Sequence, residues 1–162
     1  MPEWAVEIGR LFREFHKLPL SEITVLDVGC GIGLYKGVPY KESEYLYYEG
    51  NPIGIDPLPQ KIKTGKFIRG TGEHIPICSE TVDVVLSVSS MDHMLGPKKF
   101  VLEAHRVLKK GGSLFVALGI RRSIIHFWQP TEEEFKNFFS PPFRVEKFEC
   151  HSIMSFLKVV KC

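Results

Sequence analysis

Short apolar runs recur along the chain at intervals that suit strands of a sheet. They are rich in Val, Ile and Leu, as expected for strands buried on both faces. Such runs cover residues 23–28, 53–56, 66–69, 82–88 and 113–119. Two more strands with a tight connection are predicted at the end of the chain, over residues 143–151 and 152–161. Amphipathic segments separate several of these runs, and this pattern favours an open α/β sheet.

Three segments carry apolar residues at helical spacing. In residues 2–17, Trp4, Ile8 and Phe12 fall on one face, which predicts a helix that covers one side of the sheet. The alternative is that this helix closes over a ligand site. A second helix is predicted over residues 97–109, ended by the pair Gly111-Gly112.

The third predicted helix begins after Thr131, which forms a capping box with Glu134. The connections after the first two strands are poor in helix signals. After the first strand, only residues 41–48 suit a short helix, and only nine residues, 57–65, separate the second strand from the third. A parallel crossover usually needs a dozen or more residues. We therefore expect trimmed helices after strands one and two.

The first strand runs directly into a glycine turn. Gly29, Gly31 and Gly33 allow a sharp turn and the close approach of a ligand, because they have no Cβ. Backbone N–H groups after such a turn can point at an anionic group. The spacing G-x-G-x-G differs from the dinucleotide fingerprint G-x-G-x-x-G. The nearby carboxylate of Asp27 would repel a pyrophosphate and suits a ligand with an ammonium group. The alternative is a tight strand-to-helix turn that binds nothing.

A second carboxylate ends the strand over residues 53–56. At that position Asp56 can accept hydrogen bonds from the two ribose hydroxyls of an adenosine ligand. Leu58 then lies where it can pack on the adenine face. The alternative is that Asp56 is a turn residue before Pro57. This feature supports an adenosine group without choosing between cofactors.

Three stretches resemble the class I S-adenosylmethionine-dependent methyltransferases. The run Val25–Gly33, VLDVGCGIG, is similar to motif I of that family. Gly70–Ile77, GTGEHIPI, is similar to a segment that commonly reads Gly-Asp-Ala-Glu-x-Leu-Pro-Phe, with Thr71 in place of the acidic residue. The run Leu102–Leu114 is close to the family pattern Glu-x-x-Arg-Val-Leu-Lys-Pro-Gly-Gly. The resemblance extends in the right order over residues 23–161.

The resemblance implies a three-layer, Rossmann-like α/β fold. Its seven-stranded sheet is mostly parallel, with an antiparallel last strand. It further implies one domain over residues 1–162, with a covering helix in residues 1–20 and a core in residues 21–162. The implied cofactor is S-adenosyl-L-methionine. The residues expected to bind it are Asp27, Gly29, Cys30, Gly31, Gly33, Asp56, Pro57, Leu58, Thr71, Gly72, Glu73, Ser87 and Val88.

His93 is the candidate catalytic residue, because it follows strand four on the side where the methyl group is transferred. Imidazole titrates near neutrality and suits a general base. The alternatives are a structural histidine, or one that binds substrate or cofactor without proton transfer. Asp92 is expected to orient His93 or to cap the following turn. His126, in the loop after strand five, is a second acceptor-side candidate.

Composition narrows the class of partner. The 162 residues are 44% hydrophobic and 25% charged, with a net charge of +2, which offers no strong signal for nucleic acid or membrane. Four scattered cysteines lack a C-x-x-C pair, so we expect neither a disulfide framework nor a metal site. No signal peptide or membrane-spanning run is recognised. We therefore expect a cytoplasmic enzyme with a small-molecule acceptor, and leave a homodimer open.

Two other functions stay open at this point. The trimmed helices and the lack of an acceptor-binding insertion suit a cofactor-binding subunit that needs a partner chain for activity. An NAD-dependent oxidoreductase is the other alternative, but it conflicts with the glycine spacing and with Asp27.

Overall fold

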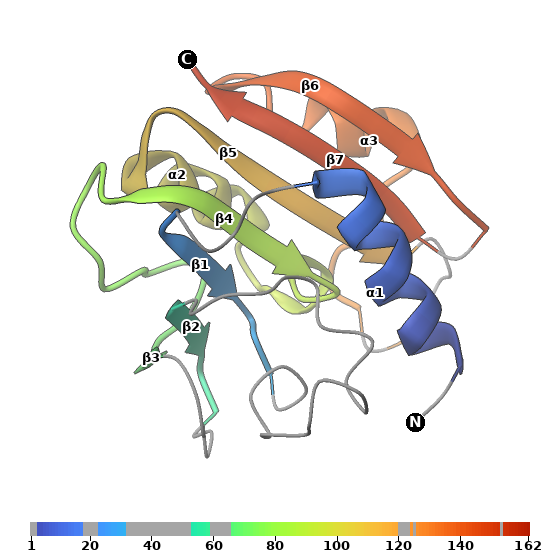
Figure 1. Ribbon diagram of the computed structural model, residues 1–162, viewed down its shortest axis with the longest axis horizontal. Coiled ribbons are helices and arrows are strands. Elements are labelled where there is room, and N and C mark those ends of the chain that lie inside the picture. The colour runs from blue at the N-terminus through green and yellow to red at the C-terminus, as the bar shows by residue number, and fades with distance from the viewer. Residues whose placement is uncertain are drawn as a thin grey trace.

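A computed structural model describes residues 3–17, 23–31, 53–58, 66–119, 124, 126–152 and 154–162. Within these residues the strands form one seven-stranded sheet in the order β3-β2-β1-β4-β5-β7-β6 (Figure 1). The strands are β1 (Val25–Val28), β2 (Ile53–Asp56), β3 (Lys66–Arg69), β4 (Val82–Val88), β5 (Leu108–Gly119), β6 (Phe143–Cys150) and β7 (Met154–Lys161).

The sheet is mostly parallel. β1 lies at its centre and pairs in parallel with β2 and β4, placing Leu26 opposite Ile53 on one side and opposite Val85 on the other. β2 with β3 and β4 with β5 are also parallel pairs. β7 is antiparallel to both β5 and β6. The mixed sheet with an antiparallel last strand is therefore confirmed.

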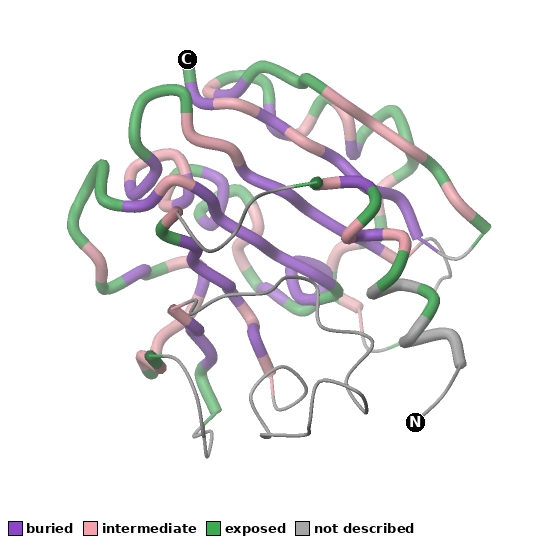
Figure 2. Tube along the Cα trace, viewed as in Figure 1, coloured by how far each residue is buried: buried purple, intermediate pink, exposed green. Residues whose placement is uncertain are grey.

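Helices cover both faces of the sheet, which gives the expected three layers (Figure 1). On one face, α2 (Pro97–Val107) and α3 (Glu132–Asn137) contribute fully buried or nearly buried side chains such as Phe100 and Phe135 to the larger core. Buried residues run along the central strands, as Figure 2 shows. The capping box of Thr131 and Glu134 at the start of α3 is also confirmed.

On the other face lies α1 (Glu3–His16). Its fully buried Phe12 packs against Phe156 of β7, with ring centroids 5.7 Å apart. Phe15 packs against Phe115 of β5 and against Phe156, at 6.1 and 5.5 Å. The helix therefore covers β5 and β7, as the covering role predicts.

The boundary between α2 and β5 differs from the prediction. α2 ends at Val107, and β5 begins at Leu108, so Gly111 and Gly112 lie within the strand and do not end the helix. Leu108 is fully buried with an extended backbone (φ −67°, ψ 137°) and pairs with Val82 of β4. Pairing and burial of this leucine outweigh the helical periodicity that extended to residue 109.

Two predicted features lie outside the described residues. These are the short helix over residues 41–48 and the trimmed crossover, of which only Pro57 and Leu58 are described. Among the described helices, none is long and apolar enough to cross a membrane.

Candidate functional site

The backbone of the turn after β1 lies against the side chain of Ser90, two residues beyond the end of β4. Gly29 has a φ of +75°, and a Cβ added to it would lie 2.3 Å from the Cβ of Ser90. Any larger residue at position 29 would therefore have a strained backbone, and its Cβ would overlap Ser90. The hydroxyl of Ser90 donates to the carbonyl of Val28 at 2.8 Å and lies 2.8 Å from the hydroxyl of Ser87. These contacts hold the turn against the end of β4.

The described N–H groups of this turn, those of residues 29–31, bind β2 instead of pointing at an anionic ligand. Gly29 and Cys30 both donate to the carbonyl of Ile55, at 2.7 and 3.1 Å. The N–H of Gly31 donates to Oδ2 of Asp56 at 2.9 Å. The strand ends β1 and β2 are thus joined by the main chain and by one carboxylate.

Asp56 is buried, with only 7% of its surface exposed. Its second oxygen, Oδ1, accepts from the N–H of Leu58 at 2.9 Å. From the described residues, each carboxylate oxygen accepts one backbone hydrogen bond, which leaves it a second lone pair for a ligand hydroxyl. Two hydrogen bonds hold the side chain in one orientation before any ligand arrives.

A cavity of about 480 Å³ opens at this edge of the sheet. Its volume is within the range of small-molecule sites. Eight of the predicted site residues line it: Gly29, Asp56, Pro57, Leu58, Thr71, Gly72, Glu73 and His93. Five further residues line it too: Gly70, Ser89, Ser90, Met94 and Leu95.

Six predicted cofactor residues are not among the described residues that line this cavity. Four of them are buried: Asp27, Cys30, Ser87 and Val88. The N–H of Gly31 donates to Asp56, and Gly33 lies outside the described residues. Burial raises the pKa of the Cys30 thiol, and the carboxylates of Asp27 and Asp56 raise it further. The thiol is therefore neutral at physiological pH and is no nucleophile.

The segment after β3 forms one wall of the cavity. A Cβ on Gly72 would lie 2.7 Å from Cε of Met94, so this wall also depends on a bare backbone. Glu103 of α2 accepts the N–H of Ile75 at 2.9 Å, and Arg106 donates to the carbonyl of Ile75 at 2.8 Å. The side-chain hydrogen bond from Arg106 lowers the pKa of Glu103. The ion pair on α2 thus positions the wall.

Glu73 was expected to bind the cofactor. Its Oε1 accepts the N–H of Gly96 at 3.2 Å, just before α2 begins. The side chain therefore ties the cavity wall to the start of α2 while the residue still lines the cavity.

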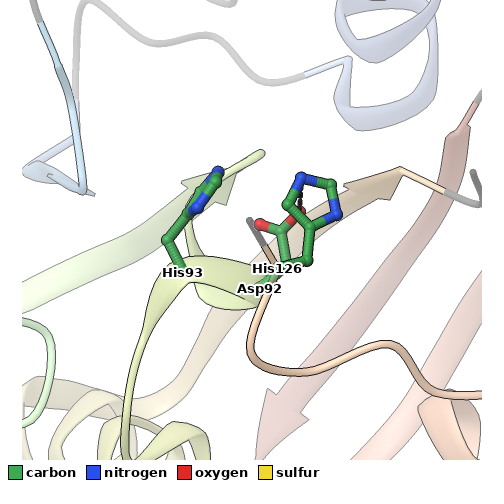
Figure 3. Close-up of side chains that lie close together, drawn as sticks. All are labelled: Asp92, His93 and His126. Carbon is green, nitrogen blue, oxygen red and sulfur yellow. Dashed lines mark ion pairs between the residues drawn. The ribbon is translucent and has the colours of Figure 1, made fainter. Parts of the chain in front are cut away.

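η2 (Met91–His93) follows β4 and contributes His93 to the cavity lining. The loop that contains His126 does not line the cavity but lies beside η2. His93 is exposed and lines the cavity, and its ring centroid lies 4.9 Å from that of His126. Asp92 is 2% exposed, and its Oδ2 lies 3.3 Å from Nε2 of His126 (Figure 3). The carboxylate thus pairs with His126, a contact that the sequence did not indicate. The two predicted roles of Asp92, orienting His93 or capping the following turn, stay predictions.

Sequence reasoning missed part of this arrangement for a physical reason. Ser90 and Met94 were not predicted as site residues because each acts by filling space against a glycine from another segment. Local periodicity carries no signal for such contacts. The pairing of Asp92 with His126 likewise depends on how a distant loop returns to the sheet.

Comparison with known proteins places the chain in a family. A family model for a methyltransferase domain matches residues 26–116. An uncharacterized methyltransferase of Mycobacterium bovis is 31% identical over 117 residues, which cover 67% of this chain and 44% of that protein. The chain thus spans less than half the length of the curated relatives it matches.

Solved structures show the same fold. An S-adenosylmethionine-dependent methyltransferase from Aquifex aeolicus has a TM-score of 0.73 at 21% identity, covering 99% of this chain and 94% of that one. A complex of the Haloferax volcanii Trm112 methyltransferase activator with a putative methyltransferase has a TM-score of 0.71 at 17% identity, covering 98% and 96%. Because the family model covers more than half of the chain, this protein belongs to the class I S-adenosylmethionine-dependent methyltransferases.

Proposed function

We propose that residues 1–162 act as a single S-adenosylmethionine-dependent methyltransferase domain that methylates a small-molecule acceptor. The observation that carries this proposal is the pairing of a buried, pre-oriented Asp56 with the bare backbone of Gly29 in one cavity. A carboxylate held there suits the ribose diol of the cofactor, and the glycine admits the ligand close to the sheet edge.

The lining residues fit the other parts of the cofactor. Leu58 is 65% exposed and presents an apolar side chain on which an adenine ring can lie. Thr71 and Gly72 offer a hydroxyl and backbone groups to the adenine edge. Asp27, next to the turn, supplies negative charge near the proposed position of the cofactor's ammonium group. The remaining residues of the proposed site give it its shape: Cys30, Gly31, Gly33, Pro57, Glu73, Ser87 and Val88.

When bound, the cofactor supplies an electrophilic methyl group on a positively charged sulfur, which keeps the electron pair of the broken bond after transfer. The chain's own contribution is to hold donor and acceptor in line and to exclude water. His93 ends η2, the short helix that follows β4, and lines the cavity, so we place it beside the reacting atom of the acceptor. Leu95, which is 82% exposed, forms an apolar edge there.

The first experiment is calorimetric titration with S-adenosylmethionine, S-adenosylhomocysteine and NAD. We expect the two sulfur compounds to bind and NAD not to bind. Asp56→Ala should lower the affinity for S-adenosylhomocysteine at least about tenfold, because a hydrogen bond to a charged group contributes roughly 1.5–3 kcal/mol. Asp56→Asn keeps one acceptor oxygen and should lose less. Glu146→Ala, which removes an acid from an exposed ion pair with Lys158, is the control.

Two results would contradict the proposal. One is a preference for NAD over both sulfur compounds. The other is an unchanged affinity in a folded Asp56→Ala protein, which would show that the ribose does not bind at this carboxylate.

A second candidate is a cofactor-binding subunit that is active only with a partner chain. The fold likeness to a putative methyltransferase in complex with the Trm112 methyltransferase activator motivates it. Exposed Ile124 and Phe127 near the acceptor side offer apolar surface to such a partner, or to a second copy of this chain. This candidate predicts tight cofactor binding without turnover on any acceptor. Turnover by the isolated chain, shown to be monomeric by sedimentation, would reject it.

A reducing, cytoplasmic compartment suits this activity. All four cysteines, Cys30, Cys78, Cys150 and Cys162, are free thiols. Unpaired cysteines are typical of proteins in a reducing environment. Fractionation of the cells that make the protein tests this placement.

A further inference from the structure

Three side chains with metal-binding atoms converge at the acceptor end of the cavity. Asp92, His93 and His126 each offer one ligand atom, and these atoms all lie within 4.8 Å of one another. The first two belong to η2, and the third comes from the loop that follows β5. Figure 3 shows the Asp92 carboxylate gathered with the two imidazole rings.

Asp92 has an oxygen that the protein does not satisfy. Its Oδ1 is buried and has no hydrogen-bond partner among the described residues. The other oxygen lies 3.3 Å from His126, longer than the 2.7–2.9 Å or so of a charge-assisted hydrogen bond. A buried carboxylate without a full set of partners is costly, and a bound cation removes that cost.

The main chain holds the carboxylate and His126 in fixed relation. The carbonyl of Asp92 accepts the N–H groups of Phe127 and Trp128, at 2.7 and 3.3 Å. The Trp128 ring packs on Phe138, with centroids 4.4 Å apart. The loop is therefore tied to η2 on one side and to the core beside α3 on the other, so His126 is positioned before any ligand binds.

We propose that Asp92, His93 and His126 bind one divalent transition metal ion of the zinc type. Two imidazoles and one carboxylate are a donor set that zinc and its neighbours accept, whereas Mg²⁺ prefers oxygen ligands alone. Zinc ligands at about 2.1 Å in a tetrahedral site lie roughly 3.4 Å from one another. The limit of 4.8 Å on the observed separations is wider than this spacing, and the exposed His93 is the ligand with most room to move inward. This proposal replaces the expectation that the chain has no metal site.

Three protein ligands leave a coordination position free. Because His93 lines the cavity, that position faces the space assigned to the acceptor. Resting on the proposed function, the ion would take an oxygen, nitrogen or sulfur atom of the acceptor and hold it in line with the methyl group. His93 is then a metal ligand, and a direct role as a proton acceptor is the outcome if no metal binds.

The test is metal binding by an untagged chain stripped of metal. Co²⁺ is added, and its visible absorption is recorded, since this reports coordination by protein nitrogen and oxygen ligands. Equilibrium dialysis with Zn²⁺ gives the stoichiometry. We expect one equivalent of Zn²⁺ or Co²⁺ and no binding of Mg²⁺. His126→Ala and the isosteric Asp92→Asn should each lower Co²⁺ affinity at least tenfold.

His151→Ala is the matched control. Nε2 of His151 also lies near a carboxylate oxygen, 3.2 Å from Glu149, but this pair is not part of a three-ligand cluster within the described residues. The His151→Ala variant should bind Co²⁺ with an affinity within about twofold of that of the unchanged protein. Equal losses in the three variants, or no cobalt spectrum in the folded protein, would overturn the metal site.

Titration with S-adenosylhomocysteine in the same samples separates the two proposals. His126→Ala should bind it within about twofold of the unchanged chain, because His126 does not line the cofactor cavity. Metal binding without cofactor binding would contradict the proposed function alone. Cofactor binding without metal binding would contradict the metal site alone.

Discussion

The two ends of the cavity are built in different ways. At the cofactor end, the structure depends on backbone: Gly29 lies against Ser90, and main-chain N–H groups join the ends of β1 and β2. At the acceptor end, side chains from two separate segments meet, where the buried Asp92 pairs with the partly buried His126. The backbone end tolerates little change at Gly29 and Gly72, since a Cβ added to either overlaps a side chain from another segment. At the side-chain end, an exposed residue such as Phe127 can be replaced at little cost to the stability of the fold.

The strongest test of this contrast is Gly29→Ala against Gly111→Ala. Both glycines have a φ of +75°, but a Cβ on Gly111 meets nothing within 4 Å. Each variant pays about 1 kcal/mol of left-handed strain. Gly29→Ala also forces Ser90 away, and we expect a total loss of about 3 kcal/mol. Urea unfolding measures both, and S-adenosylhomocysteine affinity should fall more than tenfold only in Gly29→Ala. Equal unfolding free energies would show that close approach is unimportant.

A smaller effect is expected when the support beneath the turn is removed. Ser90→Ala deletes the hydroxyl that donates to the buried carbonyl of Val28 and contacts Ser87. Leaving these groups unsatisfied should cost about 1–3 kcal/mol in unfolding free energy. Ser89→Ala is the neighbouring control, because its hydroxyl makes a weak contact, 3.9 Å to the sulfur of Met154. If both variants lost the same stability, the hydroxyl of Ser90 would not be what holds the turn.

The wall formed by residues 71–77 gives a test that depends on pH. Arg106 lowers the pKa of Glu103 below its ordinary 4.5, so the folded state binds this proton more weakly than the unfolded state. The ionised pair therefore stabilises the protein above about pH 4.5, and this contribution is lost as the pH falls through the folded pKa. Glu103→Gln keeps the acceptor for Ile75 but removes the charge.

We expect Glu103→Gln to be about 1 kcal/mol less stable than the unchanged chain at pH 7. This difference should disappear on acidification. Unfolding curves at pH 7, 5 and 3.5 measure it. A difference that stayed constant across this range would mean that shape, and not charge, makes the contact.

The smallest effect is expected at the acceptor end. Phe127 is 71% exposed, and its N–H, not its ring, binds the carbonyl of Asp92. Phe127→Ala should change the unfolding free energy by less than about 0.5 kcal/mol. It should also leave S-adenosylhomocysteine affinity unchanged, so that any change in turnover reports acceptor binding. A loss of cofactor affinity would show that the two ends are coupled.

Much of the fold could be predicted because its signals are local. A run of apolar residues that ends in glycines specifies β1 and its turn, and the acid that ends β2 does line the cavity. The strand boundaries of β2, β3 and β4 agree with their hydrophobic runs. The predicted end of α2 does not agree with the structure, because Leu108 pairs with Val82 and belongs to the sheet. The helix period alone cannot register a partner that lies 26 residues earlier in the chain.

By itself, the sequence determined the strand–glycine turn, the acid at the end of the second strand and, through its likeness to a family, the class of fold and cofactor. Only the tertiary structure decided that Ser90 fills the space beside Gly29, and that Asp92 pairs with His126. The reason is physical. Turns and strands follow from the steric preferences of adjacent residues, whereas the partner of a buried carboxylate is chosen by how distant segments pack.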